Sequence, residues 1–220
     1  CCSFRGSIVA LDAKSGDELW RRHFIPPAEQ HGANAAGTPQ YGPSGVPIWA
    51  GMAMDADHLY IATGDDYSGE GSETSDAIIA LDKSSGRTVW VRQARFGDVW
   101  NGSCENVDPV NCPEDNGPDY DYGAGPVISE DSQGRRIILA GDKGGVVTAM
   151  LAENGESLWK TKVGRGGVVA GVNFGLAAHD GKVFVPISDA PDGRDYDESA
   201  RPGVYALDVD NGESVRQAPA

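Results

Sequence analysis

The chain has 220 residues, of which 40% are hydrophobic and 23% are charged, which is typical of a folded protein rather than a disordered one. The formal net charge is −15 and there is no basic stripe, which argues against nucleic-acid binding. No run of about 18 apolar residues is present, so the sequence predicts no transmembrane helix. The 30 glycines and 13 prolines, with short runs of Val, Ile and Thr, predict an all-β protein with many turns.

One strand–turn–strand motif recurs along the chain. In the first copy an apolar strand at Ser7–Leu11 leads to Asp12, a turn glycine at Gly16 and a second strand that carries Trp20. The aspartate can accept backbone N–H groups of the turn, and glycine readily adopts the positive φ that such a turn needs. The four copies span Ala10–Trp20, Ala80–Trp90, Ala149–Trp159 and Ala206–Arg216.

The repeated tryptophan predicts a β-propeller. A single hairpin cannot bury an indole ring, so each ring must pack on a neighbouring unit, and radially stacked four-stranded sheets allow this. The third copy has Leu151 in place of the aspartate and the fourth has Arg216 in place of the tryptophan, so we expect a weaker turn and an unanchored blade there. Further strands are expected at His58–Thr63, Arg136–Ala140, Val146–Met150, Lys182–Ile187 and Gly203–Leu207.

The repeat predicts only part of a propeller. About four motif copies correspond to roughly three to four blades, whereas a closed propeller has about four to eight. The chain also starts at Cys1 without a methionine and ends at Ala220 within the pattern. We therefore expect residues 1–220 to form one partial domain that packs on the remaining blades of a longer parent protein. Long loops, where propellers place their functional residues, are expected at Ile25–Ile48, Asp65–Ser75, Phe96–Gly123 and Ala190–Pro202.

Two of the four cysteines, Cys104 and Cys112, flank a short segment rich in Asn, Asp and Pro. A disulfide between them would restrict this segment and would indicate an oxidising compartment. The alternative is a pair of free thiols. The cysteine spacings match neither a zinc site nor a Cys-x-x-Cys-His haem site.

The motif Ala-x-Asp-x-x-x-Gly-x-x-x-Trp resembles the tryptophan-docking repeat of the pyrroloquinoline quinone (PQQ) propeller superfamily. The stretches between the copies resemble those of PQQ-dependent alcohol dehydrogenases, in particular the polyvinyl alcohol dehydrogenases. This resemblance implies a seven- to eight-bladed, periplasmic or secreted enzyme that oxidises secondary or polymeric alcohols with PQQ and Ca²⁺ and passes electrons to cytochrome c. The stretches include Gly42–Trp49 (GPSGVPIW), Ala62–Ser68 (ATGDDYS), Gly117–Gly123 (GPDYDYG) and Val183–Asp189 (VFVPISD).

The resemblance implies roles for three residues outside the repeat. Trp49 takes the place of the tryptophan beneath the quinone, where an indole face stacks on a planar ring. Asp65 stands where the family usually has a calcium-binding Asn, and a carboxylate is also a hard oxygen ligand; Asp66 is the second choice. Lys143 takes the place of a Lys or Arg that contacts the quinone oxygens. The structural alternatives are a packing tryptophan, a turn-capping aspartate and a solvated turn lysine.

The catalytic base is expected just before a strand at Gly123–Ser129. The family has an aspartate here that takes the alcohol proton as hydride moves to the quinone. Because this region departs from the family pattern, three residues remain candidates, with Asp121 first, Asp119 second and Asp98 third. Solvated loop carboxylates are the alternative.

Three more residues are candidate cofactor contacts. Some quinoprotein alcohol dehydrogenases cover the upper quinone face with adjacent cysteines, which suggests Cys1 and Cys2, although that pair normally lies in an earlier blade. Asn173 is a weaker candidate for the pocket wall. The family's calcium-binding glutamate would lie before Cys1.

The sequence leaves a second function open. Cofactor-free scaffold proteins, such as outer-membrane assembly lipoproteins, carry similar repeats, so the chain could be a non-catalytic propeller that binds proteins. The positions of Trp49, Asp65 and Lys143 at loop ends outside the repeat favour the enzyme, because a scaffold does not need them to converge.

Overall fold

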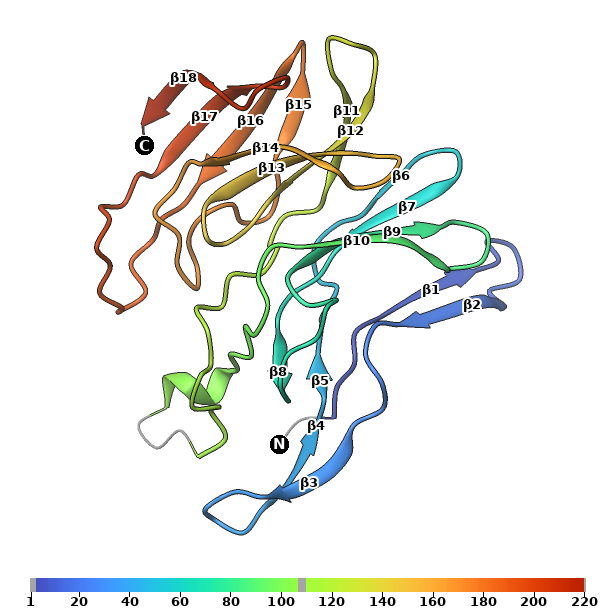
Figure 1. The fold of residues 1–220 in the computed structure, drawn as a ribbon, viewed down its shortest axis with the longest axis vertical. Helices are drawn as coiled ribbons and strands as arrows, with labels where there is room; N and C mark the ends of the chain where they lie inside the picture. Colours follow the sequence, from blue (N-terminus) through green and yellow to red (C-terminus); the bar gives the residue numbers. More distant parts are fainter. Residues whose placement is uncertain (1–2, 107–109, 220) are drawn as a thin grey trace.

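The computed structural model describes residues 3–106 and 110–219, and it confirms the predicted propeller architecture. Figure 1 shows three four-stranded antiparallel sheets that follow one another like blades, after a two-stranded sheet near the N-terminus. The two-stranded sheet comprises β1 (Ser7–Leu11) and β2 (Glu18–His23). The first full blade comprises β6 (Ala53–Met54), β7 (His58–Ala62), β9 (Ala77–Asp82) and β10 (Thr88–Gln93). The second comprises β11 (Val127–Glu130), β12 (Arg136–Gly141), β13 (Val146–Leu151) and β14 (Ser157–Lys162), and the third β15 (Ala177–His179), β16 (Lys182–Ile187), β17 (Gly203–Asp208) and β18 (Ser214–Pro219).

The first strand of each full blade lies nearest to the propeller axis. Strand β6 is in contact with β11, and β11 with β15, although these strands come from different sheets. Segments that lead into these strands therefore reach the axis, and they carry Trp49, Asp121 and Asn173. Within the described residues no helix is long and apolar enough to cross a membrane.

The loops are more structured than the sequence predicts. The segment expected as a loop at Ile25–Ile48 contains three short strands, and the one at Asp65–Ser75 contains a fourth. A single 3₁₀ turn lies in the disulfide segment, although the sequence shows no helix signal. These elements are β3 (Glu29–Ala33), β4 (Pro39–Gly42), β5 (Ser44–Gly45), β8 (Asp66–Ser68) and η1 (Gly102–Glu105).

The predicted start of one strand is wrong. The strand expected at Gly123–Ser129 begins only at Val127. The carbonyl of Gly123 accepts a hydrogen bond from the backbone of Phe174, 3.1 Å away, instead of joining a strand ladder. The glycines and the proline between Gly123 and Val127 also disfavour regular strand pairing.

Each tryptophan of the repeat docks on the turn of the next copy. The indole Nε1 of Trp90 donates to the carbonyl of Ala152 at 3.0 Å, and its ring covers Gly155. A Cβ atom at Gly155 would lie 2.7 Å from the ring, so this position needs a glycine for steric reasons as well as for its φ of 70°. The same contacts join Trp20 to Lys83 and Gly86, and Trp159 to Val209 and Gly212.

The third copy keeps its turn without the aspartate. The N–H of Gly155 donates to the carbonyl of Leu151 at 2.8 Å, as that of Gly86 does to Asp82. What the third copy lacks is a carboxylate like that of Asp82, which accepts from the backbone N–H of Ser85. The backbone bond and the glycine therefore suffice to form the turn.

We expect Trp90→Ala to destabilise the protein by about 3–5 kcal/mol, because it removes a buried aromatic ring and leaves a cavity. The matched control is Val89→Ala in the same strand, whose side chain is 39% exposed; its expected cost is at most about 1 kcal/mol. Chemical denaturation measures both. Equal losses for the two variants would mean that the indole does not hold neighbouring blades together.

A second contact between blades is centred on Asp55, in the turn after β6. Its carboxylate accepts hydrogen bonds from the backbone of His58 at 2.8 Å, the hydroxyl of Tyr60 at 3.0 Å and the guanidinium of Arg136 at 2.9 Å. Burial raises the pKa of Asp55, but the backbone hydrogen bonds from His58 and Asp57, with Tyr60 and Arg136, outweigh it and lower the pKa to about 2.

Asp55→Asn is expected to cost about 1–2 kcal/mol near pH 7. Because the folded-state pKa of about 2 lies below the ordinary value of 3.8, this stabilisation is present above that value and is lost as pH falls through 2. The unfolding free energies of the wild type and the variant, measured against pH, should therefore converge in acid. A difference that stays constant down to pH 2 would contradict the assignment.

Candidate functional site

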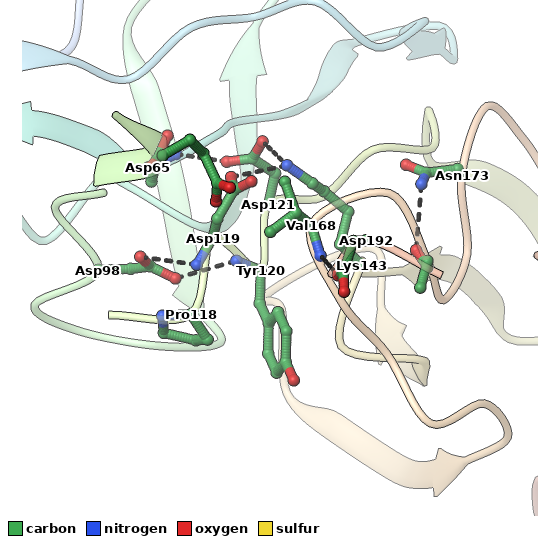
Figure 2. A network of polar contacts seen from close by, with 12 residues as sticks. Asp65, Asp98, Pro118, Asp119, Tyr120, Asp121, Lys143, Val168, Asn173 and Asp192 are labelled. Atoms are coloured by element: carbon green, nitrogen blue, oxygen red, sulfur yellow. Dashed lines mark hydrogen bonds and ion pairs between the residues drawn. The ribbon is translucent and has the colours of Figure 1, made fainter. Parts of the chain in front are cut away.

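Three buried aspartates meet near the propeller axis. Asp65 lies between β7 and β8, and Asp119 and Asp121 lie in the segment that leads into β11. One carboxylate oxygen from each lies within 4.8 Å of the others, and no other group of His, Cys, Asp or Glu in the described residues is arranged in this way. Gly64 permits the approach, because a Cβ atom there would lie 2.7 Å from Asp121 Oδ1. Figure 2 shows the carboxylates directed toward one another.

Lys143 joins this cluster from the turn between β12 and β13. Its Nζ donates to Asp119 Oδ1 at 2.7 Å and to Asp121 Oδ2 at 2.8 Å, and all three side chains are buried (Figure 2). Burial disfavours the charge of Lys143, but Asp121 and Asp119 outweigh it and raise the pKa of the ammonium group. Three ionised carboxylates and this ammonium group have a formal charge of −2.

The three carboxylates differ in which of their oxygens already accept a hydrogen bond. Both oxygens of Asp121 are engaged, since Oδ2 accepts from Lys143 and Oδ1 accepts from the backbone N–H of Asp65 at 2.7 Å. By contrast, Asp65 Oδ2 and Asp119 Oδ2 are buried without a hydrogen-bond partner in the described part of the chain. A buried oxygen without a partner carries a free-energy cost, so these two atoms are the ones suited to a cation or a proton.

Burial dominates the protonation of these two side chains. It raises the pKa of Asp119 to about 7, although Lys143 acts in the opposite direction. For Asp65, burial and the charge of Asp121 raise the pKa well above its usual range. The cluster without a cation therefore holds protons that a bound cation would displace.

Two other candidates from the sequence have structural partners. Asp98, the third choice as base, accepts from the backbone N–H groups of Asp119 at 3.1 Å and Tyr120 at 3.0 Å. Asp66, the second choice as calcium ligand, accepts from the backbone N–H of Ser72 at 2.6 Å and from its hydroxyl at 3.1 Å. Asp98 thus holds the segment that carries Asp119, and Asp66 holds the loop after β8.

Trp49 lies beside the carboxylate cluster with 43% of its surface exposed. The Nζ of Lys143 is 5.8 Å from the centroid of its ring. Trp49 and Lys143 line a cavity of about 450 Å³ together with Asn173, whose Nδ2 donates to the carbonyl of Ala170 at 3.1 Å. The structure therefore brings Trp49, Asp65 and Lys143 together, with Asn173 at the wall of the cavity.

Two residues at the site have no role in the sequence prediction. Phe174 lines the cavity, lies edge-on to Trp49 with 6.3 Å between ring centroids, is 86% exposed and has a φ of 68°. Asp76 is fully buried, and neither of its oxygens has a partner in the described residues. Burial and the charge of Asp98 raise the pKa of Asp76 to about 9. The one sequence signal for Phe174 is a large aromatic residue beside Gly175; the burial of Asp76 depends on tertiary packing.

The cysteine predictions have different outcomes. The disulfide between Cys104 and Cys112 is confirmed, with an S–S distance of 2.07 Å. It closes the segment that precedes Asp119. Cys1 and Cys2 lie outside the described residues, so their proposed contact with the cofactor stays a prediction.

Comparison with known proteins gives sequence relatives for the whole chain and solved structures that share its fold. Residues 3–108 match the PQQ family model described as the glucose/ethanol/alcohol dehydrogenase β-propeller domain. The whole chain is 37% identical to a polyvinylalcohol dehydrogenase from Pseudomonas sp. and covers 34% of that protein. The resemblance to PQQ-dependent alcohol dehydrogenases that the sequence indicates is thereby confirmed. A polyvinylalcohol dehydrogenase from Sphingopyxis sp. (strain 113P3) is 34% identical over 97% of the chain, and 33% of that relative is covered.

Solved structures of the family share the fold. The quinohemoprotein alcohol dehydrogenase from Comamonas testosteroni matches 99% of the chain with a TM-score of 0.61 and 15% identity, and 49% of that chain is covered. One from Pseudomonas putida HK5 gives a TM-score of 0.62 over the same shares. This chain thus spans about a third of the length of the two polyvinylalcohol dehydrogenases and about half of the length of the two quinohemoprotein structures.

We expect Lys143→Met to destabilise the metal-free protein by about 3–5 kcal/mol at pH 7, because it leaves two buried carboxylates without their cation. The matched control is Lys14→Met in an exposed turn, with an expected change within about 0.5 kcal/mol. Chemical denaturation in a chelating buffer measures both variants. If the two changes were equal, the ammonium group would not be needed to keep the cluster buried.

Proposed function

We propose that the parent of this chain oxidises alcohols with PQQ and Ca²⁺, and that Trp49, Lys143 and the three aspartates form its reaction centre. The observation that carries the proposal is the cluster of Asp65, Asp119, Asp121 and Lys143, because Lys143 also lines a cavity together with Trp49. The match of residues 3–108 to the PQQ family model supports the cofactor class. A scaffold propeller has no need for buried carboxylates with unpaired oxygens.

The donor set fits a hard divalent cation. Ca²⁺ prefers carboxylate and carbonyl oxygens, and the formal charge of −2 at the cluster would balance the charge of +2 on the ion. Asp65 Oδ2 is buried and without a partner, which makes Asp65 the residue that would hold the ion. Since Ca²⁺ takes about six to eight oxygens, the other ligands would come from the cofactor and from parts of the parent protein.

The cavity fits a planar ring. The exposed indole of Trp49 offers a stacking face, and the Nζ of Lys143 lies over this ring, 5.8 Å from its centroid, where it could donate to a carbonyl oxygen of a bound ring. Asn173 and Phe174 would limit how the ring lies in the cavity. Cys1 and Cys2 remain our candidates for the opposite face of the ring.

Bound PQQ would supply a hydride acceptor for the alcohol, and bound Ca²⁺ would supply Lewis-acid polarisation. The chain's own task is to take the alcohol proton. We assign this to Asp119, because its Oδ2 is buried in the cluster and has no hydrogen-bond partner among the described residues. Asp121, the first choice from the sequence, is the alternative; its two oxygens hold Lys143 and the backbone of Asp65.

We further propose that the substrates are secondary or polymeric alcohols, as the names of the polyvinylalcohol dehydrogenases suggest. The electrons would pass to a cytochrome c. The disulfide between Cys104 and Cys112 supports a periplasmic or secreted location, because such bonds persist in oxidising compartments.

Alcohol-dependent dye reduction by the full-length parent, loaded with PQQ and Ca²⁺, tests this function. Asp119→Asn should lower kcat by about 100-fold or more, since it removes the base. PQQ binding, followed by quenching of protein fluorescence, should persist in this variant and weaken in Trp49→Ala. Activity without PQQ, or activity that Trp49→Ala does not affect, would contradict the proposed centre.

Asp121→Asn separates the two candidate bases. Its amide oxygen can still accept from the backbone of Asp65, so its main loss is the ion pair with Lys143. We expect a smaller fall in kcat than for Asp119→Asn, together with weaker Ca²⁺ binding. A larger fall in kcat with unchanged Ca²⁺ affinity would assign the base to Asp121.

A further inference from the structure

A larger cleft, of about 750 Å³, lies among β3, β4, β8 and the disulfide segment. Figure 1 shows these short elements gathered at one end of the molecule, apart from the four-stranded sheets. Its volume is within the range of sites that take ligands larger than a simple alcohol. The sequence analysis gave this region no role beyond that of loops.

The lining of the cleft is polar but nearly uncharged. Glu70 is the only carboxylate among the described lining residues, and neither lysine nor arginine is present. Three amide side chains form one group, in which Asn34 Nδ2 and Gln40 Nε2 both donate to Asn111 Oδ1, at 2.9 Å and 3.4 Å. Such a wall favours ligands that form hydrogen bonds without carrying charge, because a charged ligand would be desolvated without a counter-charge.

The cleft also offers surfaces for carbon atoms. Tyr41 and Tyr67 present aromatic rings, and Pro43 and Pro113 present apolar rings. Aromatic faces beside amide groups can bind a chain that alternates C–H and O–H groups. The C–H groups would pack on the rings, and the O–H groups would form hydrogen bonds with the amides. A neutral chain rich in hydroxyl groups has this chemistry.

Tyr67 connects the cleft with the candidate reaction centre. It lines the cleft and follows Asp65 by two residues along the chain. Two residues of chain span at most about 7 Å, so this wall of the cleft lies close to Asp65. A chain held in the cleft would therefore have the reaction centre close to one end.

We propose that this cleft binds a neutral polyhydroxylated chain and presents one of its secondary alcohols to the reaction centre. The inference rests on the proposed alcohol oxidation and deepens it, because it assigns a polymeric substrate to a defined surface. The amides of Asn34, Gln40 and Asn111 would bind hydroxyl groups, and the ring of Tyr41 would pack on the carbon chain.

The test compares kcat/KM for a vinyl alcohol oligomer with kcat/KM for 2-pentanol, in the parent protein loaded with PQQ and Ca²⁺. Tyr41→Ala and Gln40→Ala should each lower the ratio of oligomer to 2-pentanol about tenfold, the equivalent of one good contact. The matched control is Gln133→Ala in the exposed turn between β11 and β12, which should leave the ratio at the wild-type value. An unchanged ratio in both cleft variants would overturn the proposal.

Binding to the cofactor-free protein, followed by saturation-transfer NMR, separates this proposal from the proposed function. Oligomer binding that weakens in Tyr41→Ala supports the cleft even if the loaded parent oxidises no alcohol, in which case only the proposed function fails. Dextran fragments provide a second arm, because a preference for them would identify a polysaccharide as the source of the same chemistry. Preferential binding of polyacrylate, a charged chain, would overturn the assignment.

Discussion

The docking of each tryptophan on the turn of the next repeat is the contact on which this structure depends. The indole of Trp90 needs both a bare glycine and a free carbonyl on its neighbour, and these stand at fixed positions of every copy. Because the contact is repeated, it places successive sheets around one axis. The loops that enter the innermost strands then converge, and residues far apart in the sequence, such as Asp65 and Asp121, meet.

This architecture permits an electrostatic arrangement that is unfavourable in isolation. Asp65, Asp119 and Asp121 are buried within reach of one another, and one ammonium group compensates for part of their charge. Asp76 and Asp98, also buried, add to the repulsion. The tryptophan contacts and the blade cores must offset this cost. Groups that weaken the empty protein in this way are typical of functional sites, where a ligand restores the balance.

The sequence predicts the blades well because the repeat encodes them locally. The turn glycine of all four copies, and the tryptophan ten residues after the first alanine in three of them, are visible without any tertiary information. The grouping of Trp49, Asp65 and Lys143 could also be predicted, through the family resemblance. The hydrogen-bond partners of each carboxylate oxygen could not be predicted from the sequence. Asp98 accepts from the backbone of Asp119, and Asp121 from the backbone of Asp65, only after distant loops have met. The sequence does not predict strands β3, β4, β5 and β8, because their short segments lack an alternating pattern of apolar and polar residues.

The most direct test of the central claim is a crystal structure of the parent protein with PQQ and Ca²⁺ bound, with the cation located by its anomalous scattering. We expect a calcium ion coordinated by Asp65, a quinone ring parallel to the indole of Trp49, and Lys143 in contact with a quinone oxygen. A quinone bound away from Trp49, or a cation held without Asp65, would contradict this arrangement.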